Sequence, residues 1–79
     1  MREVVAGGLY RHFKGNEYRV LHVATHSETM ERYVVYQALY GERGVWVRPL
    51  NMFVEDVERD GRVQPRFALI SAENGQNEG

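Results

Sequence analysis

Short runs of apolar and polar residues, separated by glycine and proline, extend over most of this chain. The runs are rich in Val, Tyr, Phe and Trp, which favour strands, and predict strands at residues 8–13, 17–24, 32–40 and 45–48. Within 17–24 the apolar positions change from the face of Tyr18 and Val20 to the face of Leu21 and Val23, and this slip predicts a bulge. Residues 41–44, with a glycine at each end, are expected to form the loop of a hairpin.

The pattern is less regular after residue 48. Pro49 cannot donate a backbone hydrogen bond, so residues 50–53 are expected to form a turn or a short 3₁₀ piece. Residues 54–58 fit a strand better than a helical turn, 59–61 fit a turn, and extended chain resumes at 62–63 and 65–70. The whole pattern predicts a mainly β fold, a small SH3-like, partly closed barrel of five to six short strands with at most short helical turns. Closure of the barrel would hide the edges of such short sheets.

The length allows one domain. With 79 residues the chain has room for a single core, which we expect at residues 1–70. Residues 71–79 contain alanine as their only apolar side chain, so burial cannot repay the entropy of ordering them. They are predicted to form a disordered tail.

Charge and cysteine content limit the function classes. Ten Lys and Arg against eleven Asp and Glu give a net charge of -1, so nucleic acid is possible but not favoured as a partner, and an anionic membrane is not expected. The absence of cysteine excludes disulfides and thiolate chemistry. The amino terminus has no signal-peptide pattern, and no apolar run approaches the length of a membrane span. These features predict a cytoplasmic protein.

Both faces of the 32–40 strand carry apolar residues. One face holds Val34, Tyr36, Ala38 and Tyr40, and the other holds Tyr33, Val35, Gln37 and Leu39. A barrel this small buries one face, so the other is either covered by a loop or a contact surface, and the sequence leaves the choice open. Trp46 and Arg48 on the next strand add a flat aromatic ring and a planar cation. This combination is suited to ligand recognition, but it is also consistent with Trp46 and the tyrosines being core and surrounding residues of a small barrel.

The histidines do not predict a metal site. His22 and His26 would lie about 13 Å apart along a strand, whereas two nitrogens bound to one zinc ion lie about 3 to 4 Å apart. His26, Ser27 and Glu28 contain the residue types of a hydrolytic triad, but neighbours on an extended chain point in opposite directions. A better explanation is that Ser27 or Thr29 caps the local turn, with a nearby glutamate reaching a free amide.

Several motifs occur in order along the chain: Gly8-Leu-Tyr-Arg-His-Phe-Lys-Gly15, His26-Ser-Glu-Thr29, Val34-Val-Tyr-Gln-Ala-Leu-Tyr-Gly41, Trp46-Val-Arg-Pro-Leu50, Met52-Phe53 and Pro65-Arg-Phe67. Through these the chain resembles the bacterial domain-of-unknown-function family 1653. The resemblance implies an SH3-type barrel in a bacterial cytoplasmic protein, and it carries no established activity, substrate or cofactor. The motif residues that packing explains least are His12, His26, Glu28, Tyr36, Gln37, Trp46, Arg48 and Arg66.

These residues are therefore the predicted binding site. The function predicted is a non-enzymatic small-β binding module without cofactor or metal, whose partner, a small ligand, a peptide or a protein, the sequence does not identify. One alternative is a small acid–base enzyme that uses His26 and Glu28. Another is an RNA-binding barrel that stacks bases on aromatic rings. The sequence leaves the oligomeric state open.

Overall fold

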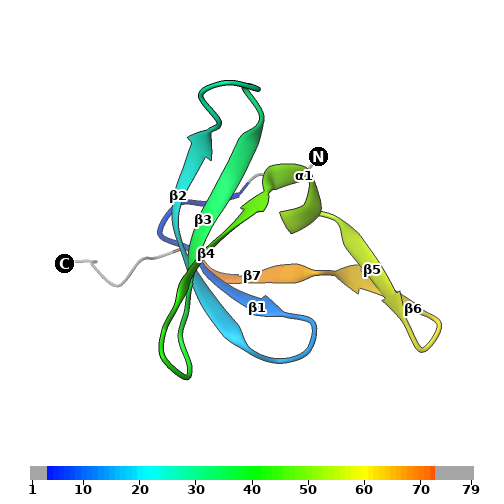
Figure 1. Ribbon diagram of the computed structural model, residues 1–79. Helices are drawn as coiled ribbons and strands as arrows, with labels where there is room; N and C mark the ends of the chain where they lie inside the picture. The colour runs from blue at the N-terminus through cyan, green and yellow to red at the C-terminus, as the bar shows by residue number, and fades with distance from the viewer. Residues whose placement is uncertain (1–3, 73–79) are drawn as a thin grey trace.

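The computed structural model describes residues 4–72 and contains seven strands and one short helix (Figure 1). In chain order these are β1 (Leu9–His12), β2 (Glu17–Thr25), β3 (Arg32–Ala38), β4 (Val45–Pro49), α1 (Leu50–Phe53), β5 (Asp56–Arg59), β6 (Arg62–Pro65) and β7 (Phe67–Ser71). The four strands expected before residue 50 are present with ends that differ by at most two residues from the predicted ones, β3 stopping at Ala38 rather than Tyr40, and α1 is the short helical piece expected after Pro49. The fold is mainly β.

The strands form two antiparallel sheets, and no closed barrel is present in the described residues. The first sheet has the order β4-β3-β2-β1-β7, and the second is the β5–β6 hairpin. The edge strands β4 and β7 are not hydrogen-bonded to each other, so the first sheet stays open (Figure 1). The predicted barrel closure is not confirmed.

The prediction of five to six strands was also too low. The chain after Phe53 divides into three short strands, because two positions interrupt it. Asp60 and Gly61 both have positive φ, 57° and 76°, which is the backbone of a two-residue hairpin turn. Arg66 then separates β6 from β7, and its N–H donates to the Glu55 carbonyl instead of a strand partner.

The predicted bulge is confirmed in β2. The β2–β3 register shifts between Val20 and His22, so that Val20 pairs with Tyr36 while Val23 pairs with Val34. Leu21 is the extra residue. The shift keeps both Val20 and Val23 on the same face of the sheet, which is why the apolar pattern changes phase within one strand.

The structure decides which face of β3 belongs to the core. Val34, Tyr36 and Ala38 are buried, whereas Tyr33, Val35 and Gln37 are partly exposed on the other face. The helix α1 covers the core face and inserts Phe53, whose ring stacks on Phe67 with centroids 4.1 Å apart. The buried cluster is formed by Tyr10, Val20, Val34, Tyr36, Phe53 and Phe67. It is therefore an aromatic core between one sheet and one helical turn.

Ser71, the first residue of the tail predicted at residues 71–79, is the last residue of β7, and residues 73–79 lie outside the described residues. Among residues 4–72, no helix has the length and apolar composition that crossing a bilayer requires.

Candidate functional site

Six side chains from separate parts of the chain meet at one end of the core face. Because side chains alternate along a strand, β1, β2, β3, β4 and β7 each direct one of these side chains to the core face, while Arg66 lies between β6 and β7. We call the group the basic aromatic cluster; its members are His12, Tyr18, Tyr36, Arg48, Arg66 and Phe67. Four of them were predicted as site residues from the sequence: His12, Tyr36, Arg48 and Arg66. The fold brings these four together.

Arg48 is held in place by two contacts with the core. Its Nε donates a 3.2 Å hydrogen bond to the Tyr36 hydroxyl, and its guanidinium lies over the Phe67 ring, 5.7 Å from the centroid. The register places Arg48 opposite Val34 on the core face of the sheet. Among residues 4–72, the two Nη groups of Arg48 have no hydrogen-bond or ion-pair partner. Arg48 is thus a fixed cation with free donors.

The ring of His12 packs against two aromatic rings of the cluster, those of Phe67 and Tyr18. Its centroid lies 5.0 Å from that of Phe67 and 6.4 Å from that of Tyr18, both edge to face. Burial lowers the pKa of His12 from its ordinary value of 6.5, and the charges of Arg66, Arg48 and Lys14 lower it further. The Nδ1 atom accepts the N–H of Lys14 at 3.2 Å, so a neutral His12 carries its proton on Nε2. His12 therefore presents an N–H donor among three cations.

Tyr18, a member of the cluster, is linked to Tyr40 of the β3–β4 loop. The hydroxyls of Tyr18 and Tyr40 lie 2.8 Å apart and share a hydrogen bond. Burial, followed by that hydrogen bond, raises the pKa of Tyr18 to about 12, and the nearby Arg48 opposes the rise. Tyr18 was not among the predicted site residues, since its place beside Tyr36 depends on the β2–β3 register. Its ring lies 5.4 Å from that of Tyr36.

Arg66 is the second arginine of the cluster and is better compensated than Arg48. Its Nη2 forms an ion pair with the Glu55 carboxylate, and its side chain is 23% exposed. Its Nε is buried and has no hydrogen-bond partner in the described part of the chain. The backbone on both sides is also fixed, since the Arg66 carbonyl accepts the N–H of Phe13 at 2.9 Å. Glu55 offsets only one of the positive charges, so the cluster keeps an excess of positive charge.

Two other predicted residues lie near the cluster in sequence but outside it in space. Gln37 points to the opposite face of β3, where its Nε2 donates to the Arg43 carbonyl at 3.0 Å and holds the β3–β4 loop. Trp46 pairs with Tyr36 across the strands and is 56% exposed. Its indole lies over Gly44, where a Cβ would come within 3.3 Å of Nε1. No aromatic ring of residues 4–72 packs against Trp46.

His26 and Glu28 lie in the β2–β3 loop and are both exposed. The Nδ1 of His26 accepts the N–H groups of Glu28 and Thr29, at 3.1 and 3.2 Å. The Thr29 hydroxyl accepts the N–H of Glu31, also at 3.2 Å. His26 and Thr29 thus act as caps for this turn. Neither predicted residue reaches the basic aromatic cluster.

No metal centre is formed by the described residues, because no three His, Asp or Glu side chains gather within reach of one ion between residues 4 and 72.

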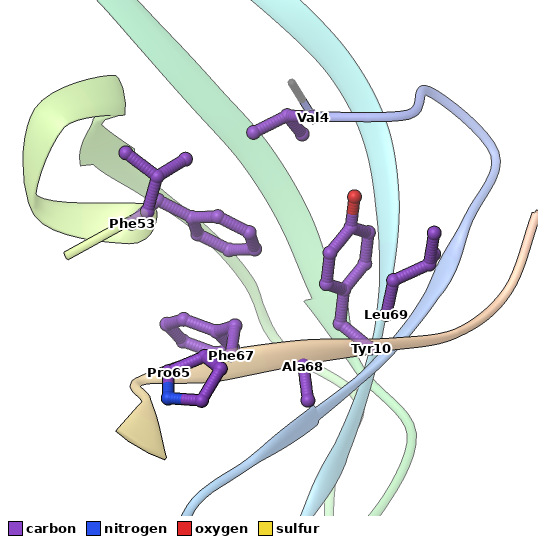
Figure 2. A pocket seen from close by; sticks show the side chains of 8 residues that line it. Val4, Tyr10, Phe53, Pro65, Phe67, Ala68 and Leu69 are labelled. Atoms are coloured by element: carbon purple, nitrogen blue, oxygen red, sulfur yellow. The ribbon is translucent and has the colours of Figure 1, made fainter. Parts of the chain in front are cut away.

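The structure does contain an apolar pocket of about 400 Å³ beside the core (Figure 2). It is lined by Val4, Tyr10, Phe53, Val54, Pro65, Phe67, Ala68 and Leu69. Tyr10 points its hydroxyl toward the amino-terminal segment and accepts the N–H of Val5 at 2.9 Å. The lining has no charged side chain, so the pocket has room for an apolar group but no charged side chain to orient a ligand.

Comparison with known proteins agrees with the resemblance in sequence. No curated protein matches the chain. A crystal structure of a DUF1653 protein from Bordetella bronchiseptica is 41% identical and superposes with a TM-score of 0.75 over 81% of this chain and 85% of that chain. The family described as "Protein of unknown function (DUF1653)" matches residues 8–69. The chain therefore belongs to the DUF1653 family.

Proposed function

We propose that this protein is a non-enzymatic binding module that recognises an anionic group of its ligand at the basic aromatic cluster. The observation that carries the proposal is the state of Arg48. Its Nε and its flat face are used by Tyr36 and Phe67, while both Nη groups are free of partners within residues 4–72. An arginine fixed in this way loses little entropy when it binds a carboxylate or phosphate, and such pairs are charge-assisted.

The neighbours of Arg48 supply the same chemistry. His12 offers an Nε2–H donor, and Arg66 and Lys14 are close enough to lower its pKa. The positive charges of Arg48, Arg66 and Lys14 repel one another, and an anion bound among them would relieve this repulsion. The tyrosine and phenylalanine rings exclude water from one side of the group, which strengthens each charged contact.

The proposal gives no role in binding to His26 and Glu28. The Nδ1 of His26 is taken by two backbone N–H groups of its own turn, and both side chains lie in the loop away from the cluster. RNA is a less suitable ligand than a small anion or an acidic peptide, since the net charge of the chain is -1.

We also infer that the fold is an opened SH3-type barrel. The support is the strand order β4-β3-β2-β1-β7 with a short helix between β4 and the last strand. In this interpretation the β5–β6 hairpin is an insertion between that helix and β7. The relative from Bordetella and the lack of cysteine support a bacterial, cytoplasmic setting.

The test is an NMR titration of the ¹⁵N-labelled chain with inorganic phosphate and, separately, with benzoate, at constant ionic strength. We expect saturable shifts of the amides around His12, Arg48 and Phe67. Arg48→Gln should weaken binding about tenfold, equivalent to about 1.4 kcal/mol. Arg62→Gln, on an exposed residue of β6, is the matched control and should bind as the wild type does. Shifts that do not saturate at millimolar anion, or equal binding by the two variants, would contradict the proposal.

A further inference from the structure

β4 is an edge strand with an apolar exposed surface. It pairs with β3 on one side, and no strand of residues 4–72 is hydrogen-bonded to its other side. Three consecutive residues, Val45, Trp46 and Val47, are 55%, 56% and 62% exposed. Natural edge strands are usually protected by lysine, a bulge or a covering loop. β4 carries one charged residue, Arg48, and that side chain turns toward the core.

The backbone of β4 has free hydrogen-bonding groups on its outer side. The N–H of Ala38 donates to the Gly44 carbonyl at 2.9 Å. Hydrogen-bonded pairs alternate along an antiparallel ladder, so Trp46 and Arg48 also direct their backbone groups toward β3. Val45 and Val47 direct theirs away from the sheet. The carbonyl of Pro49 points the same way, although this residue has no N–H to offer.

Most of the side chains beside this edge are apolar as well. On the outer face of the sheet, Val47 borders a shallow groove of about 310 Å³. The groove is also lined by Ala24, Thr25, His26, Tyr33 and Val35. An unpaired edge beside an apolar surface is the arrangement used to add a strand from another chain.

We propose that two copies of this chain pair through β4, antiparallel, with the two-fold axis at Val47. This register places Val47 against Val47 of the partner subunit and Val45 against Pro49 of the partner subunit. Trp46 then faces Arg48 of the partner subunit on the core side of the sheet, which joins an exposed aromatic ring to a cation. The free backbone groups of Val45, Val47 and Pro49 meet one another, and the missing N–H of Pro49 removes only one bond at each end.

The nearest alternative register is less complementary. Centred on Trp46, it would place the two indoles opposite each other and Arg48 opposite Gly44 of the partner subunit. It would pair fewer residues of β4 and lose both contacts between tryptophan and arginine. The near-neutral charge of the chain places no large electrostatic barrier against either pairing. The Trp46–Arg48 contacts therefore select the register centred on Val47.

The pairing would complete the surface around the basic aromatic cluster. Arg48 has Phe67 on one side, and the indole of the partner's Trp46 would lie within reach of it from the neighbouring strand. Five residues on each side form less than a standard interface. We therefore expect a weak dimer whose population rises with protein concentration.

Cysteine cross-linking tests the register directly, because the chain has no cysteine of its own. In the proposed dimer the two Val47 residues form a hydrogen-bonded pair through their backbone groups, with Cα atoms about 5.5 Å apart, within the range of about 4.4–6.8 Å for a disulfide. Val47→Cys should form a disulfide-linked dimer rapidly under mild oxidation. Val45→Cys is the matched control, because its two copies would lie about 13 Å apart. It should form no disulfide-linked dimer.

Sedimentation and fluorescence test the same pairing without cysteine. The wild type should dimerise reversibly between micromolar and millimolar concentration, and emission from its single tryptophan should shift to shorter wavelength. Val47→Lys should remain monomeric with an unchanged NMR fold, whereas Val63→Lys, on the exposed side of β6, should dimerise as the wild type does. A wild type that stays monomeric at millimolar concentration would overturn the proposal. So would cross-linking of mixed Val45→Cys and Val47→Cys without cross-linking of Val47→Cys alone.

Discussion

Two loops of this protein use a histidine in the same local way, yet only one lies at a candidate site. In each, the Nδ1 of the histidine accepts a backbone N–H two residues later, from Lys14 to His12 and from Glu28 to His26. The surroundings differ. His12 packs on Phe67 and faces cations from β4 and from the β6–β7 junction, whereas within residues 4–72 the ring that packs near His26 is Tyr33, with centroids 6.0 Å apart.

The comparison shows that the local sequence determines the turn, in which the histidine accepts a backbone N–H. The strand register determines whether that histidine lies beside other residues of the site. The His12 turn lies where β1, β4 and β7 present side chains to one face, so its imidazole joins groups that are distant in sequence. The His26 turn closes a hairpin that extends beyond the body of the sheet (Figure 1). Four predictions test this contrast, ordered here from the largest expected effect to the smallest.

Removing the Phe67 ring, on which His12 packs, should have the largest effect on stability. Phe67 is buried and contacts Phe53, His12 and Tyr36, so Phe67→Ala should reduce the free energy of unfolding by about 3–5 kcal/mol. Tyr33→Ala, in the His26 region, removes a partly exposed ring and should cost much less. Urea denaturation measures both. Equal losses would show that the two regions are packed alike; if Phe67→Ala does not fold, Phe67→Leu gives the same ranking.

The tyrosine hydroxyls of the two regions should also differ. Tyr36→Phe leaves the Nε of Arg48 without its acceptor and should cost about 1 kcal/mol. It should also weaken phosphate binding, since Arg48 loses a fixed position. Tyr33→Phe removes an exposed 3.4 Å contact with Glu31 and should leave both stability and binding within error. Weaker phosphate binding by Tyr33→Phe than by Tyr36→Phe would be the contrary result.

Gln37→Leu separates loop stability from binding. The amide holds the Arg43 carbonyl in a loop where Arg43 itself has a positive φ of 57°, so its loss should cost about 1 kcal/mol. Because Gln37 faces away from the cluster, phosphate affinity should not change. Denaturation and titration of the one variant supply both values. A stabilised variant with lost affinity would instead make Gln37 a ligand contact.

The smallest effect concerns proton binding by His12. Arg48→Gln removes one of the charges that lower its pKa, so the pKa should rise toward 6.5, while Arg62→Gln should not move it. The sign for folding follows from linkage. With the folded-state pKa below the unfolded value, the unfolded chain takes up a proton first, and stability falls as the pH drops through 6.5 to the folded-state pKa. NMR titration of the His12 ring measures the shift, and an unchanged pKa in Arg48→Gln would remove Arg48 from the cluster.

Much of the local structure followed from sequence. The phase change at Leu21 predicted the bulge, the glycines at 41 and 44 predicted the hairpin loop, and Pro49 marked the start of the helical turn. The open sheet did not follow, because nothing in the short strands after Phe53 indicates which strand they pair with. Register also decided the site. Gln37 and Tyr36 are adjacent in sequence and lie on opposite faces, and Tyr18 joined the cluster only through its pairing with β3.

The measurement that tests the central claim most directly is the pKa of His12 in the wild type with and without saturating phosphate. An anion bound among Arg48, Arg66 and His12 should favour the imidazolium, so phosphate should raise the pKa of His12, and the rise should saturate together with the amide shifts. Potassium chloride at the same ionic strength controls for general screening. A pKa that rises equally in chloride and in phosphate would contradict the assignment of this cluster as an anion-binding site.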